Sequence, residues 1–180
     1  MKIARGLDPL SRIANLNVAW QYYMARRYDQ AIKEFDNTLE LFPRMGVAHW
    51  GRGLAYCHNG ITDVAVTDLE LAVELSGESN AALGALGFGN AVLGERKAAE
   101  ETLALLIERS KQQYVPPVTV SAIYAANGDL ENAFQWLEKA YEVRSRSLVW
   151  LAVGHEFDPL RGDPRYQDML QRMGLEDFQH

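Results

Sequence analysis

The sequence predicts an all-α protein in which one pair of helices is repeated four times in tandem. The first observation is a series of small residues that returns every 34 positions without insertion, at Ala19, Gly53, Gly87 and Ser121. The second is a series of alanines with the same spacing, at Ala31, Ala65, Ala99 and Ala133. The third is a series of bulky apolar residues, at Phe35, Leu69, Leu103 and Leu137. Small residues let two helices approach closely and large residues fill the space between successive pairs, so this period predicts a stack of helix pairs.

The same period sets the boundaries of the units and of their helices. Counted from Arg12, the four units span residues 12–45, 46–79, 80–113 and 114–147. Within these units the predicted helices span residues 11–25, 28–41, 46–58, 62–75, 80–92, 96–112, 117–127 and 130–143. Pro116 and Pro117 stand at the start of helix 117–127, where proline is tolerated because the first turn has no intrahelical donor to lose.

The turns between paired helices follow the spacing as well. Gly60, Gly94 and Gly128 occupy equivalent positions after the first helix of their units. A left-handed C-cap conformation favours glycine there, because glycine has no Cβ. Only the first unit differs, since Arg26 takes this position.

Residues 1–11 precede the first unit. Pro9 lies 34 residues before Pro43, which ends the first helix pair. We therefore interpret residues 1–11 as the remnant of a preceding repeat or as a lead-in to the array. A first pair without a neighbour would leave part of its apolar surface uncovered.

The segment after the fourth unit departs from the pattern. Residues 147–153 begin like another first helix, but the pattern breaks at Gly154. Asp163 and Pro164 then have the residue types of an N-cap and of the first position of a helix. We expect residues 148–180 to form a C-terminal cap that closes the last repeat.

The composition of the chain limits which kinds of molecule it can bind and where in the cell it is expected. The net charge of −6, from 18 basic and 24 acidic residues, argues against nucleic acid, because phosphate contacts need clustered Lys and Arg. The single cysteine, Cys57, excludes an internal disulfide and fits a reducing compartment. The N-terminus has no apolar signal sequence, and no apolar run approaches the ~18–20 residues that a membrane helix needs. The expected location is the cytoplasm, without membrane contact.

No cofactor, metal site or catalytic group is predicted. The glycine-rich stretch 84–94 lies inside a helical repeat and lacks the preceding strand that a phosphate-binding loop needs. The four histidines are scattered along the chain, at His49, His58, His155 and His180. We interpret each as a lone surface or groove residue and not as a metal ligand. Cys57 and His58 are adjacent on a helix, where neighbouring side chains point about 100° apart, so they do not pair as nucleophile and base. The prediction is a protein that is not an enzyme.

Residues 12–147 resemble tetratricopeptide repeats, because the residue types at the recurring positions match that repeat in register. Departures are few, such as Asn90 in place of an aromatic residue. The ending FDPLRGDPRYQDMLQRMGL also looks like the endings of repeat arrays in bacterial regulators, so a bacterial source is expected. The resemblance implies a right-handed α-solenoid of antiparallel helix pairs whose concave face is built mainly from first helices. In this family that face binds peptides or protein segments.

The family's register implies which residues line the concave face. They are mostly apolar and aromatic, and the implied partner-binding residues are Ile13, Leu16, Trp20, Tyr23, Met24, Trp50, Leu54, His58 and Phe88. In the second half of the array the corresponding residues are small, as at Ala122 and Ala125. Repeats that clamp the carboxylate end of chaperone peptides need basic or polar residues in this face. Val47 and Gly51 stand at such positions, so the sequence argues against that class of partner.

Two interpretations of the aromatic groove stay open. In one, the aromatic residues pack mainly against each other or against the chain's own segments. In the other, they form an apolar groove for a helix or an extended segment of a partner, because aromatic residues at such surfaces are the usual anchors of binding energy.

The leading prediction is a non-catalytic protein–protein interaction module that binds a protein or peptide segment in this groove. One alternative is a structural or assembly protein that self-associates, for example as a homodimer, through its uncovered N-terminal helix pair. Another is a detached regulatory segment of a larger bacterial regulator. The groove carries no charge pattern that would identify the partner.

Overall fold

A computed structural model describes residues 8 and 10–178, and within these residues the chain is helical with no β-strand. Four helix pairs follow one another: α2 (Arg12–Met24) with α3 (Tyr28–Leu41), α4 (Gly46–His58) with α5 (Thr62–Leu75), α6 (Asn80–Val92) with α7 (Arg96–Arg109), and α8 (Pro117–Ala126) with α9 (Leu130–Glu142). The predicted all-α helical repeat is therefore confirmed. The largest difference concerns α7, which was expected to reach residue 112 but ends at Arg109, where Ser110 is the C-cap.

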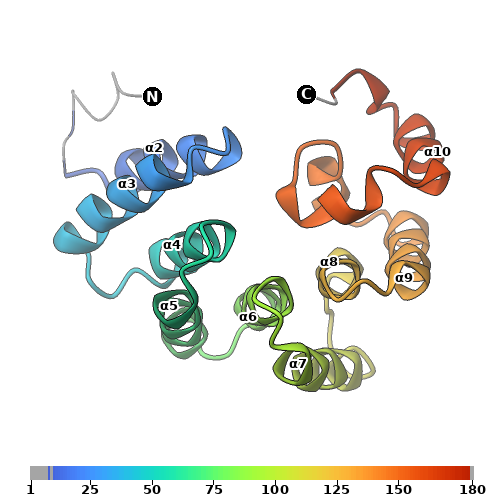
Figure 1. Ribbon diagram of the computed structural model, residues 1–180, viewed down its shortest axis with the longest axis horizontal. Coiled ribbons are helices and arrows are strands. Elements are labelled where there is room, and N and C mark those ends of the chain that lie inside the picture. The colour runs from blue at the N-terminus through green and yellow to red at the C-terminus, as the bar shows by residue number, and fades with distance from the viewer. Residues whose placement is uncertain (1–7, 9, 179–180) are drawn as a thin grey trace.

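The pairs form a curved array. Figure 1 shows α4, α6 and α8 on the inner side of the curve and α5, α7 and α9 on its outer side. Each second helix packs against the first helix of its own pair and, for the first three pairs, also against the first helix of the next pair. The curve brings the two ends of the array to face each other at the top of Figure 1, with α2 and α3 on one side and the C-terminal segment on the other.

The recurring alanines and apolar residues build the core. The four alanines of the series are fully buried, and so are Phe35, Leu69 and Leu137. Glycine is required at the crossing of α4 and α5, because a Cβ on Gly53 would lie 2.8 Å from Leu69 Cγ and 3.1 Å from the carbonyl oxygen of Ala65. The period of the sequence thus corresponds to the period of helix crossings.

The turns confirm the role of glycine and show one exception. Gly60, Gly94 and Gly128 have φ angles of 69°, 82° and 82°, in the left-handed region. Arg26, at the equivalent position, has the same conformation with a φ of 57°. A residue with a Cβ adopts this conformation at an energetic cost.

The C-terminal segment contains η1 (Arg146–Trp150), η2 (His155–Leu160), α10 (Pro164–Met173) and η3 (Glu176–Phe178). Helix α10 begins as predicted, because the Asp163 side chain accepts a hydrogen bond from the backbone N–H of Arg165. Pro9, on which the interpretation of residues 1–11 rests, lies outside the described residues.

Helix α10 lies where the second helix of a fifth pair would lie. The N-cap residues of the second helices recur every 34 positions, at Arg27, Ile61, Glu95, Asp129 and Asp163. Two ion pairs join α9 to α10, Arg165 with Glu131 and Arg172 with Glu138, and in each pair the partners are 34 residues apart in the sequence. The short 3₁₀ helices η1 and η2 stand where the first helix of a fifth pair would be, and η2 packs against α8. We infer that residues 148–178 cap the array as an incomplete fifth unit.

The close crossing of α4 and α5 can be tested with Gly53→Ala. Overpacking typically costs ~1–3 kcal/mol, and the higher helix propensity of alanine offsets up to about 1 kcal/mol of this cost. We expect the variant to lose on the order of 1 kcal/mol in its free energy of unfolding, measured by urea denaturation. Gly162→Ala is the control, because a Cβ there meets no atom within 4 Å. Equal stability of the two variants would contradict this account of the crossing.

Candidate functional site

The nine residues predicted to line the groove lie on α2, α4 and α6, and their exposure changes along these helices. Ile13, at the start of α2, is 70% exposed. Tyr23, Leu54 and Phe88 are buried. The remaining five are half-buried: Leu16, Trp20, Met24, Trp50 and His58. The concave face is therefore open on the side where the first helices begin, and largely covered on the side where they end.

The cover on the second side comes from the chain itself. His155, in η2, lies with its ring centroid 4.8 Å from that of Tyr23 and 5.5 Å from that of His58. Tyr28 stacks on His58 with 4.8 Å between centroids. The ring of Phe88 lies 6.1 Å from His58. These five side chains, here called the aromatic–histidine cluster, join α2, α3, α4 and α6 to the C-terminal segment.

Hydrogen bonds fix the rings of this cluster. The Tyr28 hydroxyl lies 3.1 Å from His155 Nδ1, and His155 Nε2 lies 3.4 Å from the carbonyl oxygen of Met24. Since a carbonyl only accepts, Nε2 of His155 donates, and in the neutral ring Nδ1 accepts the Tyr28 hydroxyl. The Tyr23 hydroxyl similarly lies 3.2 Å from His58 Nε2. The two imidazoles are thus held between tyrosines.

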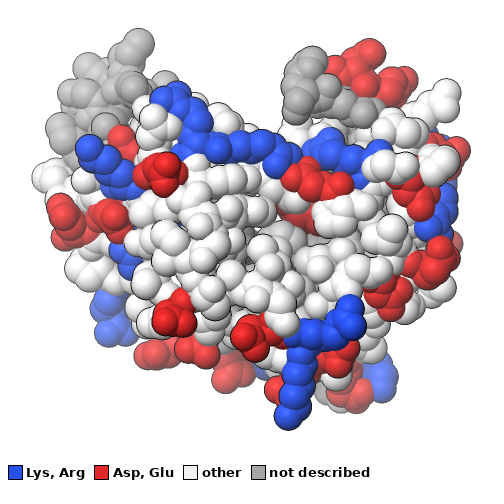
Figure 2. Space-filling model, viewed as in Figure 1, with Lys and Arg blue, Asp and Glu red and all other residues white. Residues whose placement is uncertain are grey.

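An ion pair lies beside the cluster. Arg26 Nη1 and Nη2 donate to the two carboxylate oxygens of Asp158 at 2.6 Å and 2.7 Å. Arg161 Nε donates to the same carboxylate at 2.8 Å, and its guanidinium also contacts the carbonyl oxygen of Ala152. Burial alone would raise the pKa of Asp158, but the hydrogen bonds from Arg26 and Arg161 outweigh it and hold the pKa below its ordinary value. Figure 2 shows basic side chains crossing between the two ends of the array, with acidic atoms beside them.

Burial and charge keep the two histidines neutral. Burial, reinforced by the proximity of His155, lowers the pKa of His58 from 6.5 to about 4. Burial and the nearby Arg26 guanidinium lower the pKa of His155. A proton on either ring would place a second positive charge close to Arg26 in a poorly solvated space.

The open side of the groove, here called the open rim, consists of Ile13, Leu16, Val47 and Trp50 at the starts of α2 and α4. Val47 is 37% exposed although it is apolar. Trp50 packs edge-on against Trp20 with 6.2 Å between ring centroids. Its buried indole N–H has no hydrogen-bond partner among residues 8 and 10–178. An unpaired buried donor costs about 1–3 kcal/mol, and this side of the groove contains such a donor, for which the described part of the chain provides no acceptor.

His49 and His155 correct the interpretation of the histidines as lone surface or groove residues. His49 is buried on α4, where its ring contacts Asp68 Oδ1 and the carbonyl oxygen of Pro43, each at 2.9 Å. Arg52 pairs with Asp68 and with Asp36 in the same network. His155 is buried against α2 and α3. The period could not show these contacts, because neither histidine belongs to a recurring series.

The single cysteine, Cys57, is buried. Burial raises the pKa of the Cys57 thiol to about 12, so the thiol stays protonated at neutral pH. Within the described part of the chain, no three His, Cys, Asp or Glu side chains are grouped so that they could hold a metal ion. In the same residues, no helix combines the length and the apolar character that crossing a membrane requires.

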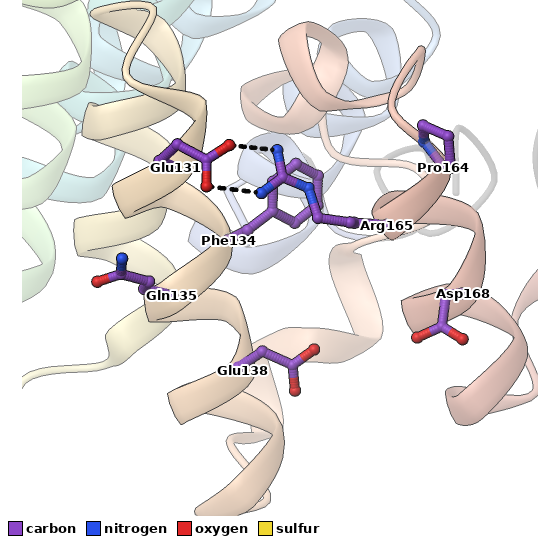
Figure 3. A pocket seen from close by; sticks show the side chains of 7 residues that line it. All are labelled: Glu131, Phe134, Gln135, Glu138, Pro164, Arg165 and Asp168. Carbon is purple, nitrogen blue, oxygen red and sulfur yellow. Dashed lines mark hydrogen bonds and ion pairs between the residues drawn. The ribbon is translucent and has the colours of Figure 1, made fainter.

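A second hollow, of about 450 Å³, lies between α9 and α10 on the outside of the array. Figure 3 shows Arg165 extending from α10 over the ring of Phe134 toward Glu131, with Glu138 on the side of α9 that faces α10. Arg165 lies 4.2 Å from the centroid of the Phe134 ring and 2.9 Å from Glu131. The charge of Arg165 is thus paired within the protein. We interpret the hollow as a gap left where α10 packs against α9, and not as a binding site.

Comparison with known families identifies the repeat. A tetratricopeptide repeat model matches residues 16–85, which include α3, α4 and α5, most of α2 and about the first half of α6. No curated protein matches the chain. The helix pairs of the structure continue with the same spacing beyond the matched residues, through α9.

The cluster predicts how stability depends on pH. The pKa of His58 is lower in the folded chain than in the unfolded chain, so its contribution is complete above about pH 6.5 and is lost as the pH falls toward about 4. We expect the free energy of unfolding to fall over this range by on the order of 2 kcal/mol more in the wild type than in His58→Gln. Chemical denaturation at a series of pH values measures this difference.

The comparison with His58→Gln is needed because burial raises the pKa of Glu156, whose effect on stability has the opposite sign in this range. The side-chain oxygen of glutamine can still accept a hydrogen bond from the Tyr23 hydroxyl. Parallel pH profiles for the two proteins would show that His58 is not buried as a neutral ring.

Proposed function

From the match of residues 16–85 to the tetratricopeptide repeat, we propose that this chain is a non-catalytic module that binds a segment of another protein. Proteins of this family generally mediate protein–protein interaction and are typically non-catalytic. We propose the concave face as the binding surface, with the open rim as its entrance.

The exposure of the open rim is the observation that carries the proposal. Ile13 and Val47 expose apolar side chains at equivalent positions of neighbouring units, next to the half-buried Leu16 and Trp50. Clustered apolar exposure of this kind marks interaction surfaces, and a tryptophan at the centre is a typical anchor. A backbone carbonyl of a bound segment could accept the unpaired N–H of Trp50 after a small movement of the ring.

The binding of a segment fits this surface better than the binding of a rigid globular face. The rim is a row along the starts of two consecutive first helices, and the residues of the concave face behind it are more buried toward the aromatic–histidine cluster. An amphipathic helix or an extended strand can place successive apolar side chains along such a row. A cytoplasmic location is part of the proposal, and the single cysteine supports it.

Self-association is a second candidate. Leu10 and Ile13 are each 70% exposed and Leu41 is 46% exposed, all within the first helix pair or just before it. A second copy could cover this surface and form a homodimer. Light scattering over a concentration series distinguishes the two candidates, because a monomer at all concentrations would exclude the dimer.

Matched valine substitutions test the open rim. We expect peptides selected from a displayed random library to bind Val47→Asp at least tenfold more weakly than the wild type, because the new carboxylate would have to be desolvated on binding. Val64→Asp is the control, since Val64 is similarly exposed but lies on the second helix α5. Isothermal titration calorimetry measures both affinities. Equal weakening by the two variants, or none, would exclude the rim as the binding surface.

Trp50→Ala tests the anchor separately. Removal of a tryptophan anchor typically costs about 2 kcal/mol or more, so we expect the affinity for the same peptides to fall by roughly 30-fold or more. Circular dichroism should show unchanged helicity, because Trp50 is only half-buried. A loss of helicity would instead assign Trp50 to the core.

A further inference from the structure

The contact between the two ends of the array is unusual for a solenoid, in which each repeat normally contacts only its neighbours. Here α2 and α3, at one end, contact η2, at the other end, across the concave face. Arg26 and Asp158 are separated by 132 residues, and Tyr28 and His155 by 127. We call this contact the seam.

The seam has two unequal sides. One side, on α2, α3 and α4, consists of aromatic rings, a backbone carbonyl that accepts a hydrogen bond and a guanidinium. These groups belong to Tyr23, Tyr28, His58, Met24 and Arg26. The other side presents two groups of η2, the imidazole of His155 and, three residues later, the carboxylate of Asp158. The first side therefore binds a planar polar ring, that of His155, and a carboxylate, that of Asp158.

Most of the attachment of η2 does not depend on the seam. Phe157 and Leu160 are fully buried, and η2 packs on α8 in the manner of the next helix in the array. The two sides of the seam can therefore separate while η2 stays on α8.

The ion pair of the seam is suited to opening. The Arg26 side chain is 45% exposed and the Asp158 side chain 36% exposed, and solvent weakens an ion pair at such exposure. The left-handed backbone of Arg26 is not in itself a sign of function, since Arg144 has the same conformation with a φ of 51° and no hydrogen bond or ion pair of its side chain among the described residues. What distinguishes Arg26 is the bidentate contact of its guanidinium with a carboxylate at the opposite end of the array.

We propose that the seam is an autoinhibitory contact, in which His155 and Asp158 occupy a docking site for a partner segment that carries a planar side chain followed three residues later by a carboxylate. The proposal rests on the proposed function, and it adds that the covered half of the concave face binds such a segment when the seam opens. The partner's ring then takes the place of His155 between Tyr23 and Tyr28, and its carboxylate takes the place of Asp158 at Arg26.

The opening of the seam can be measured as a distance between spin labels at Lys33→Cys on α3 and Gln171→Cys on α10, two exposed positions at opposite ends of the array. Cys57 is buried and stays in place. We expect Arg26→Gly to add a population at longer distance, because it removes the ion pair while placing at this turn the residue that the other three units have. Arg144→Gly is the matched control, which relieves the same backbone strain away from the seam. Identical distance distributions for Arg26→Gly and Arg144→Gly would overturn the proposal that the Arg26–Asp158 ion pair holds the seam closed.

The docking site is tested with a peptide of residues 151–162, which contains the ring and the carboxylate of the proposed ligand. Asp158→Asn protein releases the seam and keeps Arg26, so we expect this peptide to bind it at least tenfold more tightly than it binds the wild type. The gain should disappear when the peptide carries Asp158→Asn, and also when the protein carries Arg26→Gly. Equal binding to Asp158→Asn and to wild-type protein would overturn the docking site. Because the library peptides of the open rim are measured separately with Val47→Asp, a failure here is distinguishable from a failure of the proposed function.

Discussion

The structure depends on the close crossing of the two helices within each pair. A buried alanine on the second helix faces a small residue on the first, so the backbones approach each other at the same place in every unit. Contacts between each second helix and the first helix of the next pair join these crossings into one array. The curvature of the whole array, and with it the meeting of the two ends in Figure 1, follows from the repetition of contacts within and between the pairs.

The meeting of the ends changes how the array behaves as a folding unit. An open stack of repeats loses stability at its ends first, because a terminal unit has one neighbour instead of two. The contacts of Arg26 and Tyr28 with η2 give the first unit a second neighbour from the other end of the chain. Such contacts form late, because a long loop must close before they stabilise the chain. The first and last units are therefore coupled in stability although they are distant in sequence.

The sequence was sufficient for the local structure and insufficient for the seam. Helix positions, the left-handed glycines and the N-cap at Asp163 follow from residue types and spacing, which act over a few residues. The contact of His155 with Tyr23 depends on the summed rotation of all the units, and no local pattern encodes that sum. Arg26 was a visible signal, since it departs from glycine at a position where glycine is favoured. Its partner could not be inferred until the path of the C-terminal segment was known.

The bidentate contact of Arg26 with Asp158 also constrains how this protein can vary in length. Many solenoids tolerate the duplication or loss of a whole repeat, because each new interface copies an existing one. Here an inserted or deleted unit between α3 and η2 would preserve every neighbouring interface and still carry the guanidinium away from its carboxylate. The number of repeats enclosed between these two residues is thus fixed by geometry, in the way that the number of blades is fixed in a closed propeller. Repeat arrays commonly grow by duplication of a unit within the gene. Such a duplication between α3 and η2 is incompatible with the contact of Arg26 with Asp158.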